Sequence, residues 1–201
     1  PSVDVQRQDN SDLYAFDGLS KFDIIQPGDL IHCDFGISYL TLNTDTQELG
    51  YILKPGETKA PEYLINALKE GNRVQDIFTN NFVVGVSGNE ILKKSLEEGR
   101  DEGLRPSIYT HPLGTYGHSA GTTIGMWDSQ GGVPFTGDYP LQYNTAYAIE
   151  LNTTVYIEEW KKDIRIMLEV PGFFGKDGFR YIKGRQTEYI LIGPNQEGLT
   201  Y

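Results

Sequence analysis

Two aspartates eleven residues apart are the first side chains whose types and spacing suggest chemistry. A short strand is predicted at residues 30–36, and residues 37–54 are rich in β-branched and aromatic residues, which favours further strand. A tight hairpin centred on Tyr39-Leu40 would place Asp34 and Asp45 opposite each other on one face, with their Cβ atoms ~5 Å apart. Two carboxylates at that distance repel each other unless a cation lies between them. The pair therefore predicts a divalent metal site, unless the register slips and leaves Asp45 in an exposed turn.

Histidine is the second residue type that could bind a metal, and the chain has three. His118 lies in the segment GHSAG, where glycines on both sides let the backbone approach a ligand closely and leave the imidazole uncovered. It is therefore a candidate ligand, although a single histidine is more often a structural residue. His32 shares a strand face with Asp34 and is expected to pack in the core or to support a ligand. His111 is the third.

Three glutamates follow in predicted strands. Glu150 is the acid in AYAIEL, and an acid in an apolar strand is unfavourable unless it is paired or bound. Ala146 and Ala148 share its face, which leaves room around the carboxylate. Glu188 in QTEYILI is similar, and Glu169 at the end of IRIMLE is its rival. The alternative for each glutamate is that it faces solvent.

The elements that position these residues are predicted from periodicity and turn signals. Residues 60–82 have apolar residues at helical spacing. A second helix, ending near Leu104, begins at SGNE, a capping box in which Ser87 and Glu90 bond each other's amides. Both helices are expected to cover a sheet. After a segment rich in Gly, Pro and Thr (106–137), strands are predicted at 145–157, 164–169, 178–183 and 187–192. Strands, two helices and strands again predict an α+β fold with a largely antiparallel sheet.

Length and charge narrow the class of protein. A chain of 201 residues predicts one domain with a core of its own. The single cysteine, Cys33, excludes an intramolecular disulfide, and no apolar run approaches the ~18 residues of a membrane span. The net charge of −11 argues against nucleic acid and anionic membranes as partners. An acid excess focused in a cleft would instead attract cations. The sequence does not indicate a cellular compartment.

Taken in order, these residues resemble the ligand set of the pita-bread metallopeptidases, which include methionine aminopeptidase, aminopeptidase P and prolidase. The DFG that begins at Asp34 is similar to the family's Asp-x-Gly, and Asp45 follows at the family's spacing. GHSAG is similar to the family's His-x-x-Gly, and Glu150 lies one strand later, where the family has its first glutamate. The QTE that ends at Glu188 resembles the Gln-x-Glu that carries the last ligand of methionine aminopeptidases. The resemblance spans roughly residues 27–192.

The resemblance implies a pita-bread fold, which is a curved, largely antiparallel sheet covered by helices, with a dinuclear metal site. The implied metal ligands are Asp34, Asp45, His118, Glu150 and Glu188. Two divalent ions are expected, with manganese first and zinc, cobalt or iron as alternatives, because oxygen-rich ligation with one imidazole suits manganese. The implied activity is that of an Xaa-Pro aminopeptidase-like exopeptidase, in which Glu150 relays a proton. Peptide substrates are then the expected partners, with a homodimer as a further option.

The sequence departs from the family in two places. The family has a second histidine seven residues after the ligand histidine, and that position is Gly125 here. His111, seven residues before His118, is the candidate to replace it as a catalytic residue. The family's domains also begin with a helical pair, whereas this chain starts with irregular sequence. Residues 1–201 are therefore expected to be a single catalytic domain that lacks this pair or an upstream domain.

Three alternatives stay open. Glu169 is the other candidate for the last ligand. The histidine missing at Gly125 favours a pita-bread module that binds peptides or proteins without catalysis, although such a module has no need of four carboxylates around one cleft. A metal-independent C–N hydrolase like creatinase, on the same fold, is disfavoured because it can dispense with these ligands.

Overall fold

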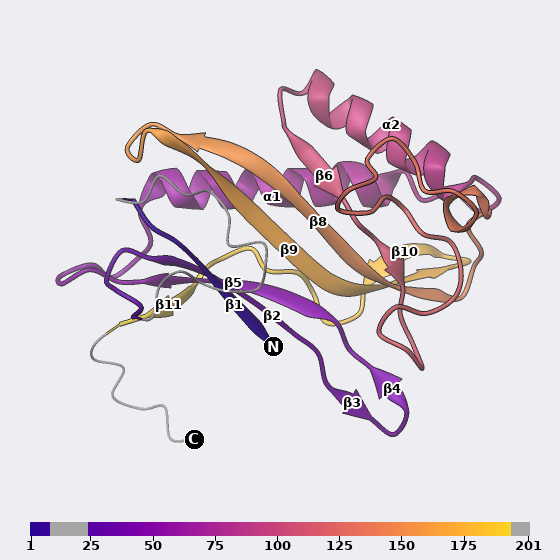
Figure 1. The fold of residues 1–201 in the computed structure, drawn as a ribbon, viewed down its shortest axis with the longest axis horizontal. Coiled ribbons are helices and arrows are strands. Elements are labelled where there is room, and N and C mark those ends of the chain that lie inside the picture. Colours follow the sequence, from indigo (N-terminus) through magenta and orange to yellow (C-terminus); the bar gives the residue numbers. More distant parts are fainter. Residues whose placement is uncertain (9–23, 194–201) are drawn as a thin grey trace.

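A hairpin of two long strands forms the centre of the fold. The computed structural model describes residues 1–8 and 24–193. Strand β8 (Thr145–Ile157) runs antiparallel to β9 (Lys162–Gly175), and Figure 1 shows them as a curved pair across the middle of the molecule. Apolar residues alternate along both strands, so that one face of each is buried, as expected for strands that cover a core.

Seven further strands complete a nine-stranded sheet. They are β1 (Ser2–Gln6), β2 (Leu30–Phe35), β5 (Thr46–Ile52), β6 (Pro106–Ile108), β7 (His111–Pro112), β10 (Gly178–Tyr181) and β11 (Ile190–Ile192). The strand order is β1-β2-β5-β9-β8-β6, with β10 on β9, β7 on β8, and β11 parallel to β5. Strands β3 (Ser38–Tyr39) and β4 (Leu42–Asn43) form a separate hairpin. A short 3₁₀ helix spans Thr136–Asp138.

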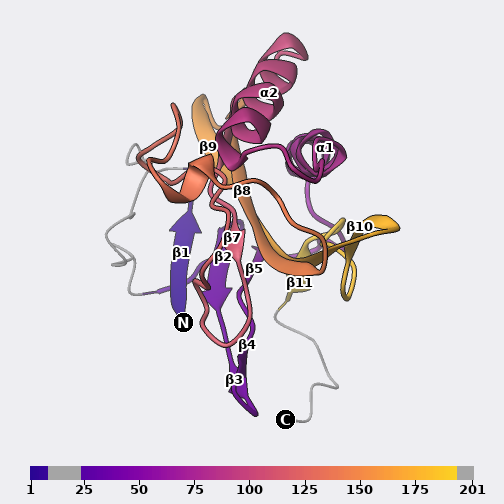
Figure 2. The ribbon, with the colours of Figure 1, turned by 90° about the vertical axis from the view of Figure 1, so that its right-hand side faces the viewer.

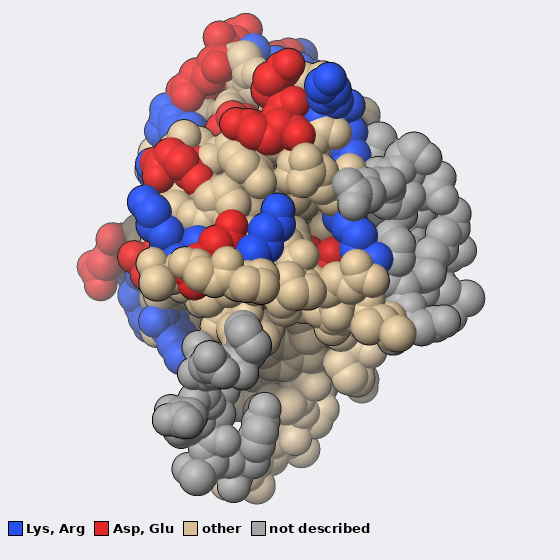
Figure 3. All heavy atoms as spheres, turned by 90° about the vertical axis from the view of Figure 1, so that its left-hand side faces the viewer, with Lys and Arg blue, Asp and Glu red and all other residues tan. Residues whose placement is uncertain are grey.

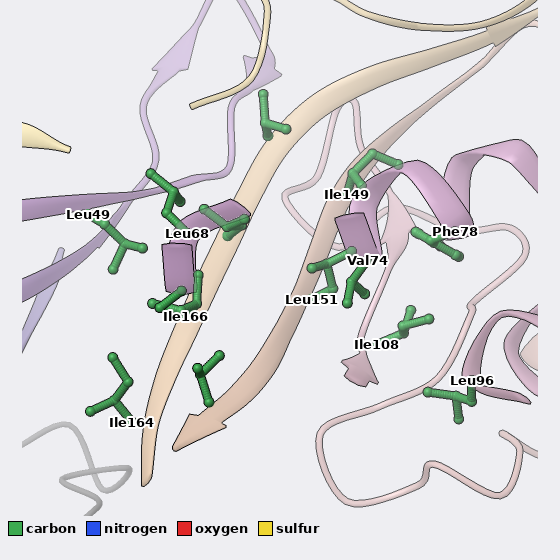
Figure 4. Close-up of a cluster of buried hydrophobic side chains, with 14 of the residues drawn as sticks. Leu49, Leu68, Val74, Phe78, Leu96, Ile108, Ile149, Leu151, Ile164 and Ile166 are labelled. Atoms are coloured by element: carbon green, nitrogen blue, oxygen red, sulfur yellow. The ribbon is translucent and has the colours of Figure 1, made fainter. Parts of the chain in front are cut away.

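Helix α1 (Glu62–Asn80) packs against the two long strands, and helix α2 (Gly88–Asp101) packs against α1 and the short strand β6. The two helices lie side by side in Figure 2, at the end of the molecule away from the projecting β3–β4 hairpin. Figure 4 shows Leu68 of α1 near Ile166 of β9, and Leu96 of α2 nearest to Ile108 of β6, all within the core. The predicted helices and the predicted α+β class are therefore confirmed.

The second helix begins at the predicted capping box. The Ser87 hydroxyl accepts the Glu90 amide at 3.3 Å, and the Glu90 carboxylate accepts the Ser87 amide at 3.1 Å. Both bonds satisfy amides that the first helical turn leaves without partners.

Replacing Ser87 by alanine should lower the free energy of unfolding by about 1 kcal/mol, because one helix amide loses its acceptor. Urea titration followed by circular dichroism measures this change. Ser129→Ala is the control, since the Ser129 hydroxyl bonds the adjacent Asp128 in a turn rather than a helix end. Equal effects of the two substitutions would contradict the capping role.

The hairpin that carries the aspartates has a different register from the predicted one. Asp34 pairs with Gln47, so the turn is at Leu40-Thr41 rather than Tyr39-Leu40. Both turn residues have positive φ, 47° and 67°, as a tight two-residue hairpin turn requires. The prediction of the register was therefore wrong by two positions. A slip of two leaves every side chain on its predicted face, because side chains alternate with a period of two.

Two predictions at the chain ends also need correction. The N-terminal segment is expected from the sequence to be irregular, but residues 2–6 form β1 beside β2. Residues 9–23 of that segment lie outside the described residues. A strand was predicted at 187–192, but β11 contains only Ile190–Ile192, and Glu188 lies before it in an exposed bend.

The charged groups of the described residues are interleaved on the surface. Figure 3 shows acidic and basic side chains mixed over the upper part of one face, above a largely uncharged lower part. Among the described residues, no helix is long and apolar enough to cross a membrane.

Candidate metal centre

Four polar side chains lie close together because they occupy one row of the sheet. Asp34 of β2 is in register with Gln47 of β5, and Gln47 is in register with Glu169 of β9. Glu169 is in turn opposite Glu150 of β8. Cβ atoms of such cross-strand neighbours lie about 5 Å apart. Three carboxylates from three strands therefore share one region, and the Glu169 side chain is only 2% exposed there.

Asp45 joins this region from the opposite arm of the hairpin, directly before β5. Its carboxylate forms a group with Asp34 and Glu169 in which one oxygen from each lies within 4.8 Å of the others. Gly36 allows the two hairpin strands to approach, since a Cβ at this position would lie 2.4 Å from the Thr44 carbonyl oxygen. The predicted proximity of Asp34 and Asp45 is therefore confirmed, although the register is not.

His111 is the imidazole that the structure places among the carboxylates. Strand β7 sets it opposite Ala148 of β8, whose small side chain leaves space beside Glu150. The His111 Nε2 atom lies 3.8 Å from Asp45 Oδ2, 4.0 Å from Glu150 Oε2 and 3.8 Å from Glu169 Oε1. The other ring nitrogen, Nδ1, lies 3.2 Å from the Pro112 carbonyl oxygen. A carbonyl oxygen only accepts, so Nδ1 carries the proton and Nε2 presents its lone pair to the carboxylates.

This arrangement lacks a positive charge. The His111 Nε2 and Glu169 Oε1 atoms are both buried and have no hydrogen-bond partner among the described residues. Buried acceptors that face one another are strongly unfavourable without a donor or a cation between them. A divalent ion would satisfy both atoms at once, and carboxylates with a neutral imidazole are the donors that such ions bind. The residues therefore fit a metal.

Burial is the first cause of the pKa shifts of all these groups. Burial, followed by the neighbouring carboxylates, raises the pKa of Glu169, and burial with the charges of Asp34 and Asp45 raises that of Glu150. Burial also raises the pKa of Asp45, with Asp34 as the next cause. Burial lowers the pKa of His111 to about 4, which keeps its ring neutral. Without a cation, the carboxylates thus retain protons that a metal would displace.

The stability of the metal-free protein should fall as pH rises from about 6.5 to about 8.5. A carboxyl group with a raised pKa stabilises the fold below its ordinary pKa, and this contribution is lost as pH rises through the raised value. His111 acts in the opposite direction, but only below its ordinary pKa of about 6.5, so it does not contribute in this range.

Thermal unfolding after chelation measures this dependence. Added Mn²⁺ should raise the melting temperature more at the higher pH, because fewer protons then compete for the carboxylates. A double variant, Glu150→Gln with Glu169→Gln, is the control and should lose the pH dependence. A flat or rising profile in the unsubstituted protein would contradict the assignment.

His118 lies above this cluster rather than inside it. Its side chain is 60% exposed, and its Nε2 atom is 4.0 Å from Asp45 Oδ2. The ring stacks on His111 with 3.9 Å between the ring centroids, and the Tyr109 hydroxyl lies 3.1 Å from its Nδ1. His118 can therefore reach the Asp45 side of a metal, and its ring is also open to solvent.

Position 125, where the resembled family has its second histidine, has no space for a side chain. Gly125 has φ +72°, and a Cβ at this position would lie 2.1 Å from the Ile108 carbonyl oxygen. The seven-residue spacing instead joins His111, which is buried among carboxylates, to His118, which is exposed beside them.

Glu188 is not brought to the cluster. It is exposed and lines a surface groove beside α1, together with Lys59 and Lys69. The structure instead brings Glu169, the alternative candidate, between Glu150 and Gln47. The sequence does contain a signal for this choice. A tight hairpin closing near residues 159–160 pairs 150 with 169, and such a pairing follows once the two predicted strands are treated as neighbours.

A cavity of about 180 Å³ opens beside Glu150. Asp34, Tyr109 and Trp127 line it, together with Leu151 and Met167. Acidic, aromatic and apolar side chains thus share the lining of this cavity.

Similarity to known proteins is found at the level of structure. No family model matches the sequence, and no curated protein does. An X-Pro aminopeptidase from Thermotoga maritima superposes with a TM-score of 0.68 at 18% identity, covering 95% of this chain and 48% of that one. Methionine aminopeptidase from Thermotoga maritima gives a TM-score of 0.59 at 16% identity, covering 90% of this chain and 72% of that one.

A third similar structure does not have the name of a peptidase. The N-terminal domain of the FACT complex subunit SPT16 from Eremothecium gossypii has a TM-score of 0.68 at 12% identity, covering 95% of this chain and 42% of that one. This chain thus spans about half the length of the X-Pro aminopeptidase that it resembles. The resemblance expected from the sequence motifs is confirmed for the fold: the chain has the pita-bread fold of the X-Pro aminopeptidases, prolidases and methionine aminopeptidases.

Proposed function

We propose that this chain is the catalytic domain of a dinuclear metal-dependent exopeptidase of the Xaa-Pro aminopeptidase type. One observation carries the proposal. The buried His111 Nε2 atom has no hydrogen-bond partner among the described residues and lies within 4.0 Å of oxygens of three carboxylates. A buried lone pair surrounded by acceptors is the arrangement expected of side chains that share a metal ion as ligands.

The ligands we propose are Asp34, Asp45, His111, Glu150 and Glu169. They differ from the set implied by the motifs in the histidine and in the last glutamate. Four carboxylates carry a charge of −4, which two divalent ions balance. Manganese is the first candidate because oxygen donors outnumber nitrogen, and zinc, cobalt or iron are the alternatives.

The reaction would be hydrolysis of a peptide bond near the N-terminus of the substrate. When bound, divalent ions supply Lewis-acid chemistry that activates water and polarises the scissile carbonyl. Glu150 faces the cluster with Oε2, and it would carry a proton from the attacking water to the leaving amine. His118, whose Nδ1 lies near the Tyr109 hydroxyl, would donate a hydrogen bond to the substrate from its exposed side.

The position of His118 favours an enzyme over a binding module without catalysis. The hypothesis of a binding module depended on a missing histidine at Gly125, whereas His118 lies seven residues after His111, beside the cluster. The SPT16 domain has a similar fold, so the fold alone does not distinguish the two functions. The retained carboxylates favour the enzyme.

A metal-binding assay and a substrate panel test the proposal. Calorimetry with Mn²⁺ should find two ions per chain, and Xaa-Pro dipeptides and tripeptides should be hydrolysed in its presence. Failure to bind Mn²⁺ and Zn²⁺ would exclude the proposed site. Binding of two ions without turnover of any peptide would favour the binding module.

Glu150→Gln should reduce kcat by roughly 10²- to 10⁴-fold, because the carboxylate that carries the proton is lost. Steady-state kinetics on an Xaa-Pro dipeptide with saturating Mn²⁺ measures the loss. Glu97→Gln on α2, whose side chain is 59% exposed, is the matched control and should keep full activity. An active Glu150→Gln variant would refute this role.

A further inference from the structure

Gln47 is the uncharged member of the row of polar residues, and it connects Glu150 to a second histidine. Its side chain is buried, with 6% of the residue exposed. Its amide Nε2 lies 2.8 Å from Glu150 Oε1, and its carbonyl Oε1 lies 2.8 Å from His32 Nε2. The other nitrogen of His32, Nδ1, lies 3.3 Å from Asp4 Oδ2. Asp4, His32, Gln47 and Glu150 therefore form a continuous chain of polar contacts across β1, β2, β5 and β8.

The amide of Gln47 has a defined direction in this chain. A carboxylate that binds a metal is ionised and only accepts hydrogen bonds, and the NH₂ group of Gln47 faces it, with Nε2 2.8 Å from Glu150 Oε1. Its carbonyl oxygen then faces His32, where Nε2–H donates to it. With the amide reversed, its oxygen would face the Glu150 carboxylate, and the two acceptors would repel each other.

His32 is itself held in place. It is 5% exposed, and its neighbour Asp4 belongs to β1, which pairs with β2 so that Asp4 is opposite His32 in register. The ring is therefore fixed between two strands and presents one nitrogen to Gln47. This explains why a polar side chain shares the buried face of β2 near Asp34.

Glu150 needs a hydrogen-bond partner because its surroundings leave space for more than one side-chain rotamer. Ala148, two residues before it on the same face, is small, so packing alone does not select one rotamer. The bond from Gln47 fixes Oε1, which leaves Oε2 on the side of His111, at 4.0 Å from its Nε2. Gln47 thus determines which oxygen of Glu150 faces the metal cluster.

We propose that Gln47 is a positioning residue for Glu150, and that His32 and Asp4 act through Gln47 by holding its amide in the donating direction. The metal-related part of this inference rests on the proposed function, whereas the contact chain itself does not. Partners of this kind typically change metal affinity by about 10- to 100-fold when they are removed.

Two experiments separate the inference from the proposed function. The first uses the metal-free protein and needs no activity. In a ¹⁵N-labelled sample, the Gln47 side-chain NH₂ signals are identified by their loss in Gln47→Leu. They should shift in His32→Asn and in Glu150→Gln, and they should not shift in Glu97→Gln. Signals that are unchanged in both His32→Asn and Glu150→Gln would overturn the inference, whether or not the protein binds metal.

The second experiment measures Mn²⁺ affinity by calorimetry. Gln47→Leu should weaken Mn²⁺ binding about 10- to 100-fold and should lower kcat more than it changes KM. The matched control is Gln75→Leu on α1, a buried glutamine whose side chain bonds Asn72 away from the cluster, and it should bind Mn²⁺ normally.

A double-mutant cycle then tests whether His32 acts through Gln47. The double variant of His32→Asn and Gln47→Leu should bind Mn²⁺ no more weakly than Gln47→Leu alone, because the two substitutions remove one connected contact. Additive losses would show that His32 acts independently and would overturn that part of the inference. Unchanged affinity in Gln47→Leu would overturn the positioning role itself.

Discussion

Replacing Glu169 by glutamine should strongly reduce peptide hydrolysis, whereas the same change at Glu188 should leave it nearly unchanged. The two glutamates compete for the role of last ligand, and the structure places only Glu169 beside Glu150. Glu169 is 3% exposed, with an oxygen 3.8 Å from the His111 lone pair. Loss of a ligand that holds the metals should reduce kcat/KM by roughly 10³-fold, equivalent to about 4 kcal/mol of transition-state stabilisation.

Metal content provides the second measurement for this pair of variants. Glu169→Gln should bind fewer than two Mn²⁺ ions per chain, while Glu188→Gln should bind the same number as the unsubstituted protein. Each variant is the other's control, because both change one carboxylate to an amide. A loss of metal and activity in Glu188→Gln, with Glu169→Gln unaffected, would reverse the assignment.

The two histidines should differ in what they lose when replaced by alanine. His111→Ala removes a buried nitrogen from the centre of three carboxylates, so Mn²⁺ affinity and activity should fall together. His118→Ala removes an exposed ring above the cluster, so Mn²⁺ should still bind while kcat/KM falls by roughly 10²- to 10³-fold.

Calorimetry and kinetics on the same preparations separate these outcomes. Because His118 stacks on His111, a small change in Mn²⁺ affinity is also expected in His118→Ala. The decisive quantity is the ratio of activity loss to affinity loss, which should be larger for His118→Ala. The opposite ratio would make His118 the ligand, as its glycine-rich segment first suggested.

The sequence was informative about groups whose neighbours are close along the chain. Asp34 and Asp45 belong to one hairpin, so their proximity could be predicted even though the register was wrong by two. The capping box at Ser87 likewise involves residues three positions apart. In the hairpin the strand period of two fixes which side chains share a face, and at the helix start the Ser87 hydroxyl needs only the backbone amide three residues later.

The choice between competing ligands depended on contacts distant in sequence. Glu169 and Glu188 both follow Glu150 in predicted strands, and only the pairing of β9 with β8 and β5 brings one of them to the cluster. The local sequence around Gln47 contains no signal for its role, because that role depends on Glu150, which is 103 residues away along the chain.

The sequence by itself determined the kind of site that we propose, because the residue types, their order and the local spacing of the aspartates favour a divalent metal bound mainly by oxygen. The tertiary structure alone decided which histidine is buried and which glutamate lies opposite Glu150. The physical reason is that both choices depend on backbone geometry between distant segments: β7 docks His111 beside Ala148, the register of β9 against β8 sets Glu169 opposite Glu150, and Gly125 has no space for a side chain.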